Sequence, residues 1–188
     1  MSDLPASPHG VDDDSAAART PARRLTQRFM RTHIAHFIAL GFGSGLSPAA
    51  PGTAGTLWAW LSFLAISFVW TPSDATWGLL IGVTLLVGWW AATRTAQRAG
   101  VADPSQIVID EIVAFWLVLW LLTPAGLLEQ AAAFALFRFF DAVKPQPVRW
   151  ADSLFKGFGA RGGFGILFDD LVAAGCTLLV LALWRFVA

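Results

Sequence analysis

The distribution of charged residues constrains the fold of this chain most strongly. Five stretches contain no Asp, Glu, Lys or Arg, at residues 37–73, 75–93, 112–128, 130–137 and 171–184. A helix needs about 20 mostly apolar residues to cross the hydrocarbon core of a membrane, with a range of about 17–25. Segments of this length or slightly shorter occupy residues 56–73, 77–93, 107–122, 127–140 and 171–187. The sequence therefore predicts an all-α, polytopic membrane helical bundle with about five hydrophobic segments.

Composition supports a membrane protein and excludes several other classes. The chain is 56% hydrophobic and 14% charged, whereas soluble domains are about 45–50% apolar and about 25% charged. The 13 basic and 13 acidic residues cancel, so a nucleic-acid-binding protein that relies on a strong basic field is excluded. The single cysteine, Cys176, forms neither an internal disulfide nor a thiolate metal cage.

The N-terminal segment differs from the rest of the chain. It has an acidic run at residues 12–14 and then five arginines, Arg19, Arg23, Arg24, Arg28 and Arg31. It lacks the apolar core and cleavage site of a secretory signal. We expect a polar, disordered tail at residues 1–32, with a surface segment beginning near residue 25, and a membrane-embedded helical domain at residues 33–188. A basic arm lying on anionic lipid headgroups is the alternative interpretation of this tail.

The remaining charges indicate which side of the membrane each connection faces. From residue 33 onward, 14 of 17 charged residues lie at residues 94–111 and 138–170. Five segments that cross alternately would put both stretches and the N-terminus on one side. A four-segment model, in which residues 127–140 do not cross, would separate the two stretches. In the five-segment model, seven of the eight basic residues mark one side, which the positive-inside rule makes cytoplasmic.

Two pairs of adjacent acids lie within these charged stretches. Asp110-Glu111 and Asp169-Asp170 each directly precede an apolar run, so we expect each pair to open a helix. One such pair is explained by the favourable interaction of carboxylates with a helix N-terminus. Two such pairs are harder to explain in this way, because the adjacent like charges of each pair repel each other. A divalent cation relieves that repulsion. Oxygen ligands of this kind suit Mg²⁺, which also contacts substrate phosphate.

A third charged group lies between the two pairs. Arg138, Asp141 and Lys144 recur every three residues, which places them on one face of a helix. Pro145 predicts that this helix ends near Lys144. One interpretation is an interfacial row of ion pairs. The other is a fifth carboxylate for a metal, flanked by two cations for phosphate oxygens.

A loop rich in Gly and Pro precedes the first hydrophobic segment, at residues 41–56. It matches neither nucleotide-binding glycine motif, but its backbone amides could cradle an anion. We therefore include Gly43, Gly45 and Thr53 as candidate substrate-binding residues. His33 and His36 could donate a proton to a leaving group, although isolated histidines near an interface are usually structural.

Four motifs in this order resemble those of the phosphatidylglycerophosphatase A family. They occupy residues 43–53, 109–111, 137–145 and 165–170, and the resemblance extends from about residue 33 to residue 175. It implies a bacterial inner-membrane, Mg²⁺-dependent lipid phosphatase with a helical-bundle fold. Such an enzyme converts phosphatidylglycerol phosphate to phosphatidylglycerol and phosphate in glycerophospholipid synthesis.

The resemblance also implies roles for individual residues. The catalytic and metal-binding acids would be Asp110, Glu111, Asp141, Asp169 and Asp170. Arg138 and Lys144 would be their basic partners, and Asp103 matches a further acid of the family.

The expected reaction is phosphomonoester hydrolysis at the cytoplasmic face, with either water or an aspartate as the nucleophile. The expected partners are the lipid substrate and the membrane, without nucleic acid, and the oligomeric state stays open. The alternative is a small integral membrane transporter or ion-path protein, because acids near membrane segments also mark ion paths. A protein of that kind would place acids in the middle of helices and on both faces of the membrane.

Overall fold

The computed structural model describes residues 24–187, and every regular element in that range is helical. The expected all-α class is therefore confirmed for the described chain. The expected disordered tail lies outside the described residues as far as residue 23 and stays a prediction there. The elements are α1 (Gln27–Met30), α2 (Ile34–Ala39), the 3₁₀ helix η1 (Gly41–Leu46), α3 (Pro51–Trp70), α4 (Asp74–Ala99), α5 (Ile109–Leu122), α6 (Leu127–Val143), α7 (Val148–Leu154) and α8 (Gly159–Val187).

Three helices are long and apolar enough to cross a membrane: α3, α4 and α8. The shorter α5 and α6 have 14 and 17 residues, at or below the lower end of the range for a crossing helix. Large apolar side chains such as Phe68 and Phe186 are almost fully exposed on the long helices, as lipid-facing residues would be. These features make the chain a membrane protein, while the expectation of about five crossings stays a prediction.

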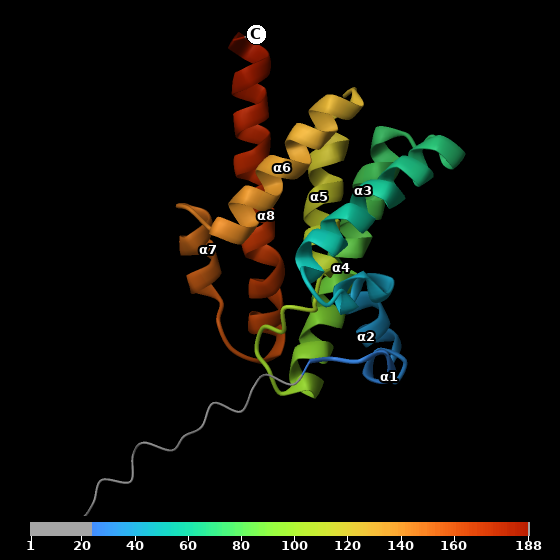
Figure 1. Cartoon of the computed structure of the whole chain (residues 1–188), viewed down its shortest axis with the longest axis vertical. Helices are drawn as coiled ribbons and strands as arrows, with labels where there is room; N and C mark the ends of the chain where they lie inside the picture. Colours follow the sequence, from blue (N-terminus) through green and yellow to red (C-terminus); the bar gives the residue numbers. More distant parts are fainter. Residues whose placement is uncertain (1–23, 188) are drawn as a thin grey trace, which may run out of the picture.

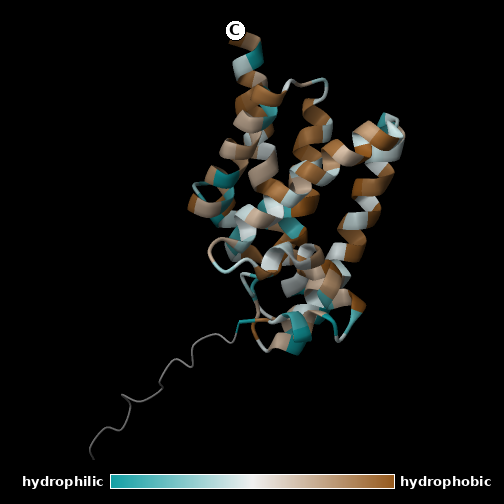
Figure 2. Ribbon diagram, turned by 45° about the vertical axis from the view of Figure 1, so that its right-hand side comes forward, coloured by the Kyte–Doolittle hydropathy of each residue, from teal (hydrophilic) through white to brown (hydrophobic). Residues whose placement is uncertain are grey.

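The helices alternate in direction (Figure 1). The α3–α4 and α5–α6 connections and the C-terminus lie at one end of the molecule, and α1, α2 and the α4–α5 connection lie at the other. Helix α5 is central and packs against α3, α4 and α8. Its core side chains include Ile112, Phe115 and Leu119, all essentially inaccessible to solvent. Figure 2 shows apolar residues over much of the long helices, with hydrophilic residues in the short helices and connections and at a few positions near both ends of the molecule.

The short segment before α2 is part of the folded body. The backbone N–H of Leu25 donates to Gln106 Oε1 at 3.2 Å, and Gln106 Nε2 donates back to the Leu25 carbonyl at 3.0 Å. Met30 at the end of α1 is buried. Leu25 and Met30 therefore contact the helical body, and the domain boundary at residue 32 stays a prediction.

Local sequence determines several helix ends. Pro51 occupies the first turn of α3, where its missing N–H costs nothing. The Ser73 hydroxyl accepts from the Thr76 N–H and caps α4. Helix α6 ends at Val143, and Lys144 follows in a left-handed conformation with φ 48°. The predicted end of this helix beside Pro145 is thereby confirmed.

One predicted helix start is wrong. Asp110 and Glu111 do lie in the first turn of α5, but Asp169 and Asp170 lie well inside α8, which begins at Gly159. The cause is close packing of the glycine-rich segment that precedes the pair. A Cβ atom at Gly163 would lie 2.9 Å from the Cα of Thr93, and one at Gly165 would collide with the Phe155 carbonyl. These glycines allow α8 to continue as a helix against its neighbours.

Candidate active site

All five predicted acids line one cavity of about 300 Å³. Its walls come from the start of α3, the α4–α5 connection, the first turn of α5, the end of α6 and the interior of α8. The cavity also receives both predicted basic side chains and the further acid Asp103. The charged residues that line it are Asp103, Asp110, Glu111, Arg138, Asp141, Lys144, Asp169 and Asp170. Residues far apart in sequence are thus brought together as the motifs predicted.

Three carboxylate oxygens in this cavity are buried without a hydrogen-bond partner: Asp110 Oδ1, Glu111 Oε2 and Asp170 Oδ2. Glu111 and Asp170 are only 8% and 3% exposed as whole residues. An ionised carboxylate withdrawn from water is strongly unfavourable unless a cation or hydrogen-bond donors compensate it. The site therefore has unsatisfied capacity to bind a cation.

Arg138 links two of the acids on one side of the cavity. Its Nη1 lies 3.3 Å from Glu111 Oε1 and also pairs with Asp141, one helical turn further along α6. The same atom lies 3.4 Å from the hydroxyl of Thr56 on α3. A Cβ atom at Gly52 would collide with Glu111 Oε1 and crowd the guanidinium. The first turn of α3 thus approaches this ion pair closely because residue 52 has no side chain.

Lys144 links two acids on the other side. Its Nζ lies 2.5 Å from Asp169 Oδ2 and 2.7 Å from Asp152 Oδ1. Burial disfavours the ammonium, but the hydrogen bonds to Asp152 and Asp169 outweigh it and raise the pKa of Lys144 above its usual range. Lys144 is therefore a fixed positive charge at neutral pH.

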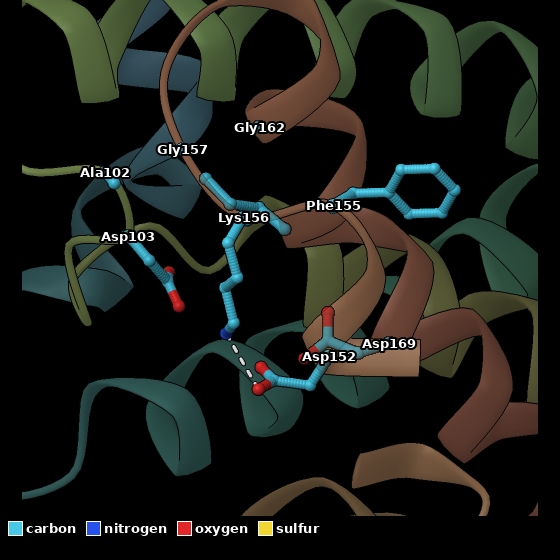
Figure 3. Close-up of a pocket in the computed structure, with 10 residues that line it drawn as sticks. Ala102, Asp103, Asp152, Phe155, Lys156, Gly157, Gly162 and Asp169 are labelled. Atoms are coloured by element: carbon cyan, nitrogen blue, oxygen red, sulfur yellow. Dashed lines mark ion pairs between the residues drawn. The ribbon is translucent and has the colours of Figure 1, made fainter. Parts of the chain in front are cut away.

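Asp152 is a functional candidate that the sequence analysis missed. It lies on α7 and accepts a hydrogen bond from Lys144. It also accepts one from Lys156 at 2.7 Å, which Figure 3 shows. Burial acts against its charge, yet these two lysines lower the pKa of Asp152. The only sequence signal was the i,i+4 spacing of Asp152 and Lys156, which is common on solvated surfaces. Asp152 also borders a smaller cavity that shares Asp103 and Asp169 with the main one.

The structure does not bring the predicted loop residues into this cavity. Gly43 lies in η1 with φ 106°, and Gly45 packs against the Gln106 carbonyl and Val108. Thr53 is exposed on the first turn of α3. Pro51 and Gly52 line the cavity instead. A substrate contact for Gly43, Gly45 or Thr53 stays a prediction.

The two histidines have structural partners. His33 Nδ1 accepts from the Ala35 N–H at 3.0 Å and caps α2, and His36 Nδ1 lies 3.0 Å from the Thr95 hydroxyl. Neither side chain lines the acidic cavity. The structural interpretation of both residues therefore accounts for their positions.

The acidic cavity suits Mg²⁺ by its donor chemistry rather than as a preformed cage. Within residues 24–187, no three His, Cys, Asp or Glu side chains are already arranged so that they could hold a metal ion. Mg²⁺ usually keeps several waters and binds through one or two carboxylates together with substrate phosphate. Three of the acids that line this cavity each have an unpartnered carboxylate oxygen, which meets that need.

The fold and the site together define an integral membrane protein with a buried, carboxylate-rich centre and two fixed cations, a combination suited to phosphate chemistry. Comparison with known sequences specifies the family: the chain belongs to the phosphatidylglycerophosphatase A family, whose model matches residues 37–185. The resemblance seen in the motifs is thereby confirmed.

Curated relatives are similar over most of their length. The phosphatidylglycerophosphatase A of Escherichia coli is 39% identical over 73% of this chain and 76% of its own. That of Haemophilus influenzae is 36% identical over 77% and 85%. A Bacteroides thetaiotaomicron protein named "Putative phosphatidylinositol-3-phosphatase" is 38% identical over 80% and 92%. No solved structure matches the chain significantly.

Proposed function

We propose that this chain hydrolyses the phosphomonoester of phosphatidylglycerol phosphate to phosphatidylglycerol and phosphate. Membership of the phosphatidylglycerophosphatase A family supports the substrate. The observation that carries the chemistry is that Asp110, Glu111 and Asp170, each with a buried, unpartnered carboxylate oxygen, line the same cavity as Arg138 and Lys144.

Mg²⁺ would be held by carboxylates drawn from Asp110, Glu111, Asp141, Asp169 and Asp170, and it would neutralise and polarise the substrate phosphate. Arg138 and Lys144 bind non-bridging phosphate oxygens, and each is oriented in advance. Glu111 and Asp141 fix the guanidinium, while Asp152 and Asp169 fix the ammonium. Charges fixed before substrate arrives need little reorganisation as the transition state forms.

An acid not engaged by the metal accepts the proton of a water that attacks phosphorus, while the P–O bond to the glycerol breaks and the leaving oxygen takes up a proton. An aspartate that attacks phosphorus and forms an acyl phosphate is the alternative. Rapid quenching of a single turnover with ³²P-labelled substrate distinguishes the two routes. A protein-bound, hydroxylamine-sensitive label supports the aspartate, and its absence throughout the turnover supports water.

The proposed location is the bacterial inner membrane, with α3, α4, α5, α6 and α8 crossing alternately and the N-terminus and active site facing the cytoplasm. The support is the enrichment of basic residues at the α1–α2 end, together with the position of the acidic cavity among helix ends. The lipid phosphate would then stay at headgroup level while its acyl chains lie between helices in the bilayer.

The interior position of Asp169 and Asp170 in α8 favours the alternative of a transporter or ion-path protein. Such a path would need acids or polar groups leading to the opposite end of the molecule. The charged groups described there are Asp74 and the ion pair between Arg185 and Glu129, at 3.1 Å. Both α8 aspartates instead line the cavity that also contains Arg138 and Lys144, an arrangement that favours phosphate hydrolysis.

An activity assay on the purified full chain tests the proposal. We expect Mg²⁺-dependent phosphate release from phosphatidylglycerol phosphate, lost on chelation and restored by added Mg²⁺. Asp110→Asn and Asp169→Asn should each lower kcat/KM by about a hundredfold or more, because they remove charge that the cation requires. Phosphatidylinositol 3-phosphate, assayed in parallel, tests the lipid preference and should be hydrolysed more slowly.

Asp74→Asn is the matched control, since Asp74 is an exposed aspartate at the start of α4 and does not line the acidic cavity. It should retain full activity. Phosphate release that survives chelation would exclude the metal-dependent mechanism, and release unaffected by both aspartate substitutions would exclude this site.

A further inference from the structure

A second cavity, of about 420 Å³, lies between α2 and the C-terminal part of α4. Its lining in the described chain contains no acidic residue. The residues are Thr32, His33, His36, Arg94, Gln97 and Arg98. None of them lines the acidic cavity, so the two cavities are distinct.

The arginines of this second cavity are not neutralised by the described part of the protein. Arg94 and Arg98 are exposed, lie one helical turn apart on α4, and form no ion pair with residues 24–187. The pKa of His36 is lowered, mainly by burial and further by the nearby His33 and Arg98. The cavity therefore has a positive potential that an anion would relieve.

An apolar groove of about 270 Å³ continues from this cavity along α4. The two share Arg94 and Gln97. Beyond them the groove is lined by Leu86, Trp89 and Trp90, of which Leu86 and Trp90 are 63% and 41% exposed. Tryptophan is enriched at headgroup level in membrane proteins.

Residue spacing explains why the two surfaces are continuous. Positions 86, 89, 90, 93, 94, 97 and 98 follow the i, i+3, i+4 pattern of one helix face. This α4 face is apolar at Leu86 and Trp90 and cationic at Arg94 and Arg98. It thus changes from apolar to positively charged over about three helical turns, as the surface of an anionic phospholipid changes from acyl chain to phosphate.

We propose that this α4 face binds an anionic glycerophospholipid of the surrounding leaflet, with its phosphate in the cationic cavity and an acyl chain against Leu86 and Trp90. The positive-inside tendency explains arginines near a helix end, but it does not explain a cavity that joins them to an exposed tryptophan groove. Free phosphate would satisfy only the cationic part.

Lipid binding to the full chain in an uncharged detergent tests this site without measuring activity. Brominated-chain phosphatidylglycerol should quench tryptophan fluorescence with saturation, and brominated-chain phosphatidylcholine should bind at least tenfold more weakly. The double variant Arg94→Gln/Arg98→Gln should weaken phosphatidylglycerol binding roughly thirtyfold, as expected for two basic residues near an anionic lipid phosphate. Trp90→Phe should reduce the amplitude of the saturable quenching.

Arg149→Gln is the matched control, because Arg149 is an exposed arginine on α7 outside both cavities. It should leave binding unchanged. Equal affinity for the two lipids, or unchanged affinity in the double variant, would overturn the proposal. Displacement of the lipid by inorganic phosphate at equal concentration would show a free-anion site instead. Failure of the proposed phosphatase activity would leave these binding results intact.

Discussion

At the scale of single residues, the acidic cavity combines satisfied and unsatisfied charges. Arg138 and Lys144 each contact two carboxylates, whereas Asp110, Glu111 and Asp170 each keep an oxygen without a hydrogen-bond partner. The ion pairs fix the cations in place, and the free oxygens leave capacity for a further cation. In the proposed mechanism, this division would let one cavity hold both a metal ion and the oxygens of a phosphate.

Asp152 gives a test of positioning at this scale. Asp152→Asn should raise KM for the lipid phosphate roughly tenfold with a smaller change in kcat, because Lys144 loses a charge-assisted hydrogen bond and its fixed orientation. Steady-state kinetics in mixed micelles measure both constants. Asp152→Glu should restore part of the lost affinity.

Lys156→Met is the control for this substitution. It removes the other ion pair of Asp152 but leaves the Lys144 contact in place, and Lys156 is exposed. Its KM should stay within about twofold of the parent value, as expected for an exposed ion pair. A KM for Asp152→Asn equal to that of the parent would show that Asp152 does not orient Lys144.

At the scale of elements, the start of α8 determines where its aspartates lie. Glycines at the α4–α8 contact let the backbones approach, as small residues do in membrane helix packing. The helix can therefore begin at Gly159 and place Asp169 and Asp170 beside α5 and α6. The acidic cavity depends on this close approach as much as on its charged residues.

Gly163→Ala tests the approach of α8 to α4. The added methyl would meet the backbone of Thr93, and overpacking of this kind costs about 1–3 kcal/mol. Thermal unfolding in detergent should show a lower transition temperature together with reduced activity.

Gly175→Ala is the matched control in the same helix, because a Cβ there meets nothing within 4 Å. Its free energy of unfolding should stay at the parent value or rise by up to about 1 kcal/mol, because Ala favours a helix interior more than Gly does. Equal stability of the two variants would show that α4 and α8 do not pack as closely at Gly163 as the structure indicates.

At the scale of the whole molecule, the two ends differ in the charged residues that they contain. The end with α1, α2 and the α4–α5 connection (Figure 1) has five arginines in these elements or next to them, Arg24, Arg28, Arg31, Arg94 and Arg98. The other end, where α3 meets α4 and α5 meets α6, has Asp74 and the Glu129–Arg185 pair. Arg185 also donates to the carbonyls of Leu122 and Pro124, which ties the end of α8 to the α5–α6 turn. This asymmetry supports a single orientation in the membrane.

Cysteine labelling in sealed inner-membrane vesicles tests the orientation. With Cys176 replaced by alanine, Ser153→Cys on α7 should react only with a reagent that reaches the cytoplasmic side, and Ala75→Cys on α4 only with one that reaches the periplasmic side. Both positions are exposed. Labelling of the two positions from the same side would contradict the alternating arrangement.

Local sequence patterns were enough to predict the helical class, the end of α6 beside Pro145 and the first-turn position of Asp110 and Glu111. Each of these depends on interactions within a few residues along the chain, namely hydrophobicity over a helix length, the steric effect of proline and the helix N-terminus. The motifs also identified the acids and cations that meet in the cavity, through their resemblance to a family.

Only the tertiary structure decided which partners those charges have. Local patterns placed the start of the last helix at the aspartate pair, because nothing local shows that Gly163 can pack against Thr93 and let α8 continue. They also missed Asp152, whose role depends on a lysine from outside its own helix. They indicated Gly43 and Gly45 as substrate-binding glycines, whereas the glycine of that loop that lines the cavity is Gly52. The sequence by itself thus determined a membrane helical chain with two pairs of adjacent acids and a third charged group between them. Packing between distant helices decided which of those charges face one another, since side-chain contacts across the bundle leave no periodic trace in the chain.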